Sequence, residues 1–318
     1  MAILPSKRAR GANARLHVGF ESAYGAPPAS GYRRLPFVSH QLGATQGWIE
    51  SDLLGQGRAP FDPTRDVVVN DGNLVVPVDT RAIGFWLRLL LGAPATTGSG
   101  GTFTHVFTSG AATLPSASAE VALPEVPQFT TNYGLRANTI QIGMQRSGLL
   151  NATLAMIGKG ETNPIEASSA GTLVEYEQIE RFAQASGSIA EGVDTLGGIA
   201  SAQFTYSNGL DKVETIQPDG EIEDVDPGMP SFTGSLVLRN LTGALQDSSR
   251  DGTPRAIDFG WVRGPHSLKF SAPRVFLPRV KLPVEGPAGL QQTVEFVASS
   301  DEGVVMTATL INDVESYA

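Results

Sequence analysis

The stretch TIQIGMQRSGLLNATLAMI, residues 139–157, indicates the class of fold. Apolar side chains alternate with polar or small ones over residues 139–144, and residues 149–157 are mostly apolar. A period of two places every second side chain on the same face of a β-strand. The stretch therefore predicts strands that bury one face.

Runs of the same kind recur at residues 66–70, 74–78 and 102–107. The chain also holds 36 glycines and 21 prolines, residues that end strands and break helices. Four dipeptides are turn signals, namely Asp71-Gly72, Asn208-Gly209, Asp219-Gly220 and Asp251-Gly252. Short strands at this spacing predict a mainly β protein, built as a sandwich or barrel.

The sequence predicts two helices, at residues 80–91 and 240–248, of which the second is the shorter. A third segment, residues 172–185, fits a helix as well as a strand. Residues 80–91 are the stronger candidate, because Gly92 and Pro94 supply an end signal and four apolar residues share one face. These four are Ile83, Leu87, Leu90 and Leu91.

A weak internal repeat indicates a duplicated unit. Residues 74–76 resemble residues 236–238 at an offset of 162, and residues 152–154 match residues 308–310 at an offset of 156. Residues 103–107 correspond loosely to 257–262. We therefore predict an N-terminal arm (1–30), a first domain (31–163), a linker (164–190) and a second domain (191–318), with one helix flanking each domain. The offset of 162 also relates Ser39, Gln41, Leu42 and Gly47 to Ser201, Gln203, Phe204 and Gly209.

Composition narrows the function. The formal net charge of -9 disfavours a protein that grips nucleic acid, since binding to phosphates relies on clustered Lys and Arg. Cysteine is absent, so neither a disulfide nor a thiolate ligand or nucleophile is available. Lys7, Arg8 and Arg10 precede no apolar run typical of a secretory signal, and no apolar stretch approaches the length of a membrane span. We expect no membrane partner.

The sequence offers no clear catalytic or metal-binding motif. The four histidines, His17, His40, His105 and His266, do not pair at metal-ligand spacing. Residues 211–226 carry seven carboxylates, but they lack the ligand order of a calcium loop, so a solvated acidic loop is the simpler interpretation. We predict that the chain is not an enzyme and needs no cofactor.

The second half nevertheless resembles a known family. The pattern consists of LGGIASAQFTYSNGLD at 196–211, a strand at 233–238, a helix near 241–246, LPRV at 277–280, GPAGL at 286–290 and TLIN at 309–312. VGFESAYG at 18–25 resembles the start of the same family. These features together resemble the tail tube (major tail) proteins of siphophages, bacteriophages with long tails, in their roughly 300-residue form.

The resemblance implies a structural virion protein of the tail, assembled in the cytoplasm of the host bacterium. It implies tail-tube-type β-sandwich or barrel domains whose inner strands close a ring, with rings stacked into a hollow tube for DNA ejection. Two such domains per chain predict a ring of three with pseudo-sixfold symmetry, and a ring of six is the alternative. Implied partners are other copies of the chain, the tape measure protein, the tail terminator, the distal tail proteins and double-stranded DNA in transit.

Acidic residues in the lumen would repel passing DNA, whereas charged arms and loops commonly join rings. The acidic candidates for the lumen are Glu50, Asp52, Glu214, Glu221 and Glu223. The basic candidates for stacking between rings are Lys7, Arg8, Arg10, Arg15, Arg58 and Arg65.

Two other classes of protein stay open. A β-sandwich adhesin, receptor-binding protein or capsid-decoration protein would share the glycine-rich and threonine-rich strands. A carboxylate-based glycosidase would need an acid pair about 5 to 9.5 Å apart, which a sequence does not reveal.

Overall fold

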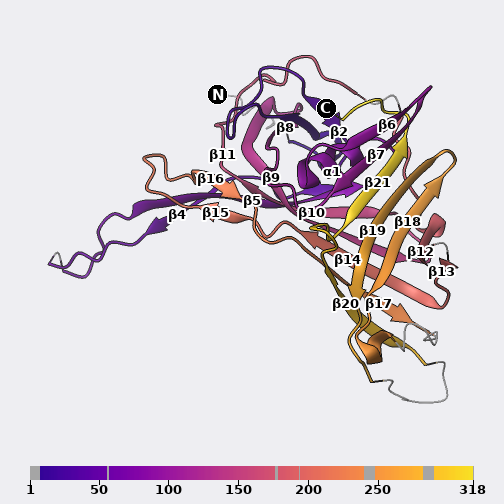
Figure 1. Ribbon diagram of the computed structural model, residues 1–318. Coiled ribbons are helices and arrows are strands. Elements are labelled where there is room, and N and C mark those ends of the chain that lie inside the picture. Colours follow the sequence, from indigo (N-terminus) through magenta and orange to yellow (C-terminus); the bar gives the residue numbers. More distant parts are fainter. Residues whose placement is uncertain are drawn as a thin grey trace.

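The computed structural model describes residues 8–55, 57–175, 178–192, 194–239, 248–281 and 290–317. It is mainly β, and 19 of its strands form one connected antiparallel arrangement (Figure 1). The first half contains η1 (Gly11–Asn13), β1 (Arg15–Phe20), β2 (Arg33–Leu35), β3 (Ser39–His40), β4 (Thr45–Ile49), β5 (Thr64–Pro77), α1 (Ile83–Leu91), β6 (Ala95–Ser99), β7 (Thr102–Thr108), β8 (Ala117–Leu123), β9 (Gln128–Gln145), β10 (Asn151–Gly158) and β11 (Gly160–Glu161). The second half contains η2 (Gln184–Ser186), β12 (Gly187–Glu191), β13 (Asp194–Thr195), β14 (Ile199–Ser207), β15 (Asp211–Val213), β16 (Asp224–Asp226), β17 (Ser231–Leu238), β18 (Arg255–Arg263), β19 (His266–Phe276), β20 (Gln292–Ser299) and β21 (Thr307–Asn312).

Eight strands lie side by side in the order β5–β10–β9–β14–β17–β20–β19–β21, and we call them the central strip. Strands far apart in the sequence meet here. Strand β14 of the second half pairs with β9 of the first, with Ser201 opposite Gln145. The two halves therefore share one sheet.

The core lies on one side of the central strip. In the first half, α1 packs over β9, and eight of its nine residues are buried. A helix that is apolar all round needs partners on every side, which explains why α1 is enclosed instead of lying on the surface. In the second half, six aromatic side chains fill the corresponding space, namely Phe204, Phe232, Phe259, Trp261, Phe270 and Phe296.

The first predicted helix is confirmed, and α1 ends where Gly92 adopts a φ of 92°. The second helix candidate, residues 240–248, lies outside the described residues except for Ser248, and residues 248–251 are helical. The described residues of the segment 172–185 form neither a long helix nor a strand. They form isolated bridges, such as Leu149 with Ala183, before the short η2.

One predicted turn is wrong. Asp71-Gly72 lies inside β5, which joins the two predicted runs 66–70 and 74–78 into one strand of 14 residues. The glycine is needed for a different reason, because a Cβ at Gly72 would lie 2.4 Å from the carbonyl oxygen of Gln41. Close backbone approach, and not turn geometry, explains this dipeptide.

The two halves of the chain, which the internal repeat relates, can be compared by the order in which their strands pair. The order β1–β8–β9–β10–β5 in the first half matches β12–β18–β19–β20–β17 in the second. Ser39 lies opposite Val75, and Ser201 lies opposite Val237, so the offset of 162 relates equivalent pairs. The match of residues 152–154 with 308–310 does not relate equivalent strands. Strand β10 pairs with β5 and β9, whereas β21 pairs with β19 and β7. The division into two tandem domains stays a prediction.

Part of the predicted linker is held by a buried carboxylate. Glu120 on β8 accepts hydrogen bonds from the hydroxyls of Ser168 (2.6 Å) and Ser169 (2.9 Å) and from the backbone N–H of Ser169 (2.7 Å). The ring of His17 on β1 lies 2.9 Å from the same carboxylate. Both serines bind the carboxylate, so among these contacts none joins a serine to the histidine as in a catalytic triad.

We expect the protein to lose stability at low pH, where Glu120 becomes protonated. Burial alone would raise the pKa of Glu120, but the hydrogen bonds from His17, Ser168 and Ser169 outweigh it and lower the pKa from 4.5 to about 2. Stabilisation by the ionised carboxylate is thus complete above about pH 4.5 and lost as the pH falls toward 2. The full effect corresponds to roughly 3 kcal/mol. Denaturant titrations at several pH values should show a steeper acid loss for the wild type than for Glu120→Gln, and parallel profiles would contradict the assignment.

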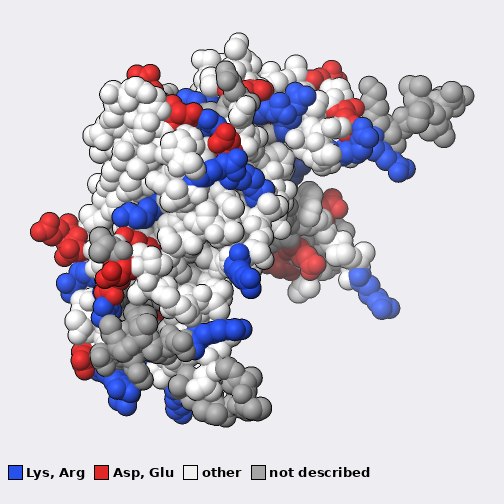
Figure 2. All heavy atoms as spheres, turned by 90° about the vertical axis from the view of Figure 1, so that its right-hand side faces the viewer, with Lys and Arg blue, Asp and Glu red and all other residues white. Residues whose placement is uncertain are grey.

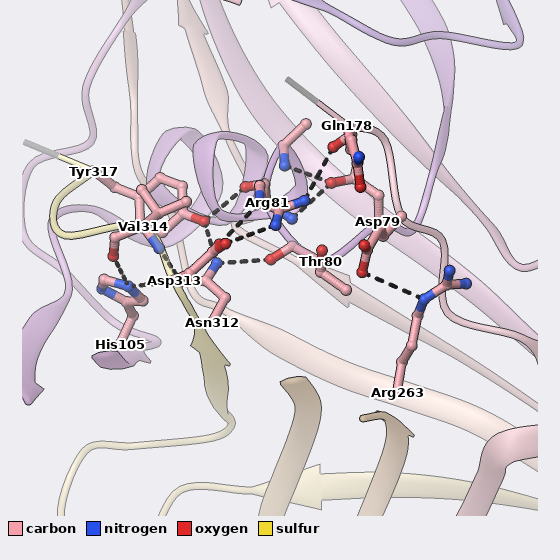
Figure 3. A network of polar contacts seen from close by, with 12 residues as sticks. Asp79, Thr80, Arg81, His105, Gln178, Arg263, Asn312, Asp313, Val314 and Tyr317 are labelled. Carbon is pink, nitrogen blue, oxygen red and sulfur yellow. Dashed lines mark hydrogen bonds and ion pairs between the residues drawn. The ribbon is translucent and has the colours of Figure 1, made fainter. Parts of the chain in front are cut away.

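The segment after β21 closes the core over the start of α1 (Figure 3). The amide of Asn312 donates to the carbonyl of Thr80 (2.7 Å) and to the hydroxyl of Tyr317 (2.6 Å), which itself donates to the carbonyl of Arg81 (2.6 Å). Both oxygens of Asp313 accept hydrogen bonds from the guanidinium of Arg81, at 2.8 and 2.6 Å. The last strand and the first helix are therefore connected by a dense polar network.

Candidate functional site

The outward face of the central strip extends over all eight of its strands. Along β14, Ser201, Gln203 and Thr205 alternate with buried Ala202 and Phe204. The register places Gln203 opposite Ser235 on one side and Gly143 on the other. Hydroxyl and amide side chains thus continue from strand to strand, for example at Thr139, Gln141, Gln145, Thr153, Ser231, Thr233, Thr293, Ser271, Thr307 and Thr309.

Few charges interrupt this face. Where the strands pair, the outward positions that carry charge are Asp71, Arg136, Lys269, Arg274 and Glu295. Two are acidic and three are basic, but Arg136 forms an ion pair with Asp224 of β16 at 3.0 Å. The acid Asp71 is also paired, with Lys212 at 2.7 Å. The face is thus mostly polar and almost neutral, although apolar side chains such as Val237 and Val297 also lie on it. Its charge differs from the net charge of the chain.

Two acidic hairpins stand at one end of the central strip, on the left of Figure 1. The first is β4–β5 with its connecting loop, and the second is β15–β16 with its loop. They touch where the N–H of Val68 donates to the carbonyl of Gly220 (2.9 Å). Both hairpins prolong strands of the strip, so they lie beyond the end of its polar face.

The five predicted acidic residues all lie on these hairpins. Glu50 follows β4 and Asp52 lies in the first loop, whereas Glu214, Glu221 and Glu223 lie in the second. Glu221 accepts a hydrogen bond from the hydroxyl of Tyr133 (2.6 Å). The structure therefore gathers these acids at one end of the strip, away from its strands, and their role in a lumen stays a prediction.

The predicted basic residues do not form one cluster. Arg58 and Arg65 belong to the β4–β5 hairpin, where the guanidinium of Arg65 lies over the ring of Trp48. Arg8 and Arg10 precede η1, and Arg10 binds Glu125. Of the others, Arg15 begins β1, and Lys7 lies outside the described residues.

Exposed apolar side chains on the β4–β5 hairpin were missed by the sequence reasoning. Trp48, Ile49, Leu53 and Leu54 are all more than half exposed, and Leu54 reaches 95%. A concentration of large apolar side chains on a protruding hairpin is typical of a surface that binds another molecule. The run Trp-Ile-Glu-Ser-Asp-Leu-Leu at 48–54 carried the signal, because a polar loop would not need four such residues.

Neither a membrane span nor a metal cluster is found in the part of the chain that the structure describes. No helix there is long and apolar enough to cross a bilayer. No group of three or more His, Asp or Glu side chains there has the geometry to hold a metal ion. In the acidic loop, Asp219 accepts a hydrogen bond from the N–H of Glu221, as in an ordinary turn.

A comparison with protein families decides to which family the chain belongs. A family model described as phage tail tube protein matches residues 11–298. The chain belongs to the phage tail tube family. It is thus a structural component of a phage tail, and the resemblance found in the sequence is confirmed. The match covers both halves of the chain, including every strand of the central strip except β21 and the end of β20. Among curated proteins, no sequence matches significantly.

Proposed function

We propose that this tail tube protein assembles into rings that stack into a hollow tube, and that phage DNA leaves the capsid through the lumen. One observation carries the proposal: an uninterrupted strip of eight strands buries one face in the core and exposes a polar face to solvent. In a ring of subunits, such strips form a closed wall. The polar face of the central strip is our candidate for the wall of the lumen.

A neutral wall suits the passage of DNA. Clustered cations would bind phosphates, and hydroxyl and amide side chains instead keep the wall hydrated without trapping a polyanion. The sequence predicted repulsion by acids such as Glu50 and Asp52. The position of these acids on hairpins favours a role at the ends of the ring over one along its wall.

The strands of the central strip also indicate how many chains form one ring. The first half of the chain contributes three strands of the strip and the second half contributes five. The pairing order β5–β10–β9 in the first half is repeated by β17–β20–β19 in the second. Three chains would then supply 24 strands, eight from each, with pseudo-sixfold symmetry. Closure into a ring also covers free strand edges, such as that of β6, for which β7 is the only partner among the described strands. We therefore favour a ring of three over a ring of six.

The remaining proposals rest on the resemblance of the sequence to the tail tube proteins of siphophages. We propose a siphophage tail, with assembly in the host cytoplasm around a tape measure protein and between the terminator and distal tail proteins. Stacking through the N-terminal arm and the β4–β5 hairpin belongs to the same proposal.

Electron microscopy of the purified protein at increasing concentration tests the proposal. We expect rings or tubes with a central hole, and end-on averages should show three repeats with six similar lobes. Six identical subunits in each ring would replace the ring of three. A closed dimer that persists at high concentration would contradict assembly into a tube.

Charge introduced on the polar face should slow the release of DNA. Gln203 is exposed near the middle of the strip, and every subunit of every ring would present the substituted residue. In virions that carry Gln203→Lys, we expect DNA ejection to slow ~10-fold, because repeated cations bind phosphates. Gln203→Glu is the matched control and should eject at nearly the wild-type rate. Equal rates for both variants, measured by dye release from the capsid, would place this face outside the lumen.

A further inference from the structure

A groove of about 630 Å³ lies at the other end of the central strip from the acidic hairpins. It is formed by the end of β9, by η2 and β12, and by the start of β14. Its apolar lining includes Met144 and Ile189, which are almost fully buried, and the partly buried Leu196 and Ile199. Leu196 and Ile199 thus give the groove a partly exposed apolar lining.

Two arginines border this groove. Arg146 follows β9 and Arg239 follows β17, and both side chains are exposed. Within the described ranges, neither forms an ion pair with a carboxylate. On the face that Figure 2 draws, Lys and Arg side chains are scattered among broad uncharged areas, and several of them lie beside Asp or Glu. An apolar groove with two unpaired cations fits a partner that combines apolar side chains with carboxylates.

The loop of the β4–β5 hairpin has this composition. Residues 50–54 read Glu-Ser-Asp-Leu-Leu. Leu53 is 64% and Leu54 is 95% exposed. Glu50 and Asp52 are exposed as well, and in the described part of the chain neither forms an ion pair.

One chain cannot place its own loop in its own groove. Strand β5 runs from Thr64 at the hairpin to Pro77, which lies opposite Asn151 near the groove end of the strip. Fourteen residues of strand span roughly 45 Å at about 3.3 Å per residue. The hairpin continues beyond β5 in the opposite direction (Figure 1). Its loop therefore reaches away from the groove of the same chain.

We propose that the groove binds residues 50–54 of a second copy of this chain. Leu53 and Leu54 would cover the apolar lining, and Glu50 and Asp52 would face Arg146 and Arg239. The proposal rests on the tube assembly proposed above. A contact between unlike surfaces at opposite ends repeats without limit when subunits are related by translation. This contact therefore joins one ring to the next and sets the direction of the tube.

Charge exchange tests the contact in the full-length protein. Arg146→Glu/Arg239→Glu should reduce the mass of pelletable tubes at least ~10-fold, because like charges then meet across the contact. Glu50→Lys/Asp52→Lys should do the same. The combined variant restores opposite charges and should recover tube formation. Arg146→Lys/Arg239→Lys is the matched control, since it keeps the charges and should polymerise like the wild type.

The outcomes separate this inference from the proposed function. A wild-type protein that never forms tubes would contradict the proposed function itself. Wild-type tubes together with normal tubes from Arg146→Glu/Arg239→Glu would overturn only the groove, as would failure of the combined variant. Leu53→Ser/Leu54→Ser provides a second test without a change in charge, and it should also lose tubes. Thermal melting of each variant checks that the subunit is folded.

Discussion

Phe204→Ala is expected to lower the free energy of unfolding by about 3–5 kcal/mol, the largest effect that we predict for a single substitution. Phe204 is fully buried on the inward face of β14. Its ring centroid lies 4.9 Å from that of Phe259, 5.1 Å from that of Phe270 and 5.3 Å from that of Phe232. Truncation would leave a cavity between three rings that neighbouring strands hold in place.

The collapse of this cavity is limited by strand pairing. Phe232, on β17, cannot shift inward without breaking the ladder with β14, in which Tyr206 and Phe232 are register partners. The substitution therefore loses both the transfer free energy of the ring and the contacts around the cavity. Urea titration followed by circular dichroism measures the change.

A matched control lies on β18. Val262 is 58% exposed and follows Trp261, which is fully buried. Val262→Ala should change stability by no more than about 0.5 kcal/mol, as is usual for exposed positions. Equal losses for Phe204→Ala and Val262→Ala would show that the aromatic cluster does not stabilise the second half of the chain.

Gly84→Ala is expected to destabilise the protein by about 2–4 kcal/mol, although alanine is the better helix former. Gly84 lies inside α1, and a Cβ built there would stand 2.2 Å from the Cζ atom of Tyr317. The tyrosine ring would have to move. Its hydroxyl would then lose the carbonyl of Arg81 and the amide of Asn312 (Figure 3).

The sign should reverse when the ring is absent. In a Tyr317→Ala background there is no clash, and Gly84→Ala should be neutral or stabilise α1 by up to about 1 kcal/mol. The comparison of the two backgrounds is a double-mutant cycle that isolates the contact of Gly84 with Tyr317. The same loss of unfolding free energy in both backgrounds, measured by thermal and urea unfolding, would mean that glycine is needed at position 84 for a reason other than Tyr317.

These predictions connect the core to the proposed tube. The central strip exposes a polar face only because Phe204 and α1 hold its other face in the core. Loosening of either contact would bend the strip and disturb the wall of the ring. We therefore expect Phe204→Ala and Gly84→Ala subunits to form fewer tubes than the wild type at equal concentration.

Local patterns accounted for much of the fold. Alternation over 139–144 correctly predicts that Ile140, Ile142 and Met144 are buried, because a period of two assigns side chains to faces whichever strand lies beside them. The apolar face of α1 and its glycine end were predicted for the same local reason. The offset of 162 also relates two register pairs, Ser39 with Val75 and Ser201 with Val237, whereas the duplication itself stays a prediction.

Long-range pairing determined the rest. Asp71-Gly72 has the composition of a turn, yet it lies in β5 because the backbone at Gln41 packs against it. The acids Glu50 and Glu221 are 171 positions apart and meet at one end of the strip only because β5 and β14 prolong into neighbouring hairpins. The residue pattern thus determines which side chains are buried. Contacts between strands that are distant in the chain decide where the acidic hairpins, the β4–β5 loop and the groove lie along the central strip. No local pattern encodes these contacts.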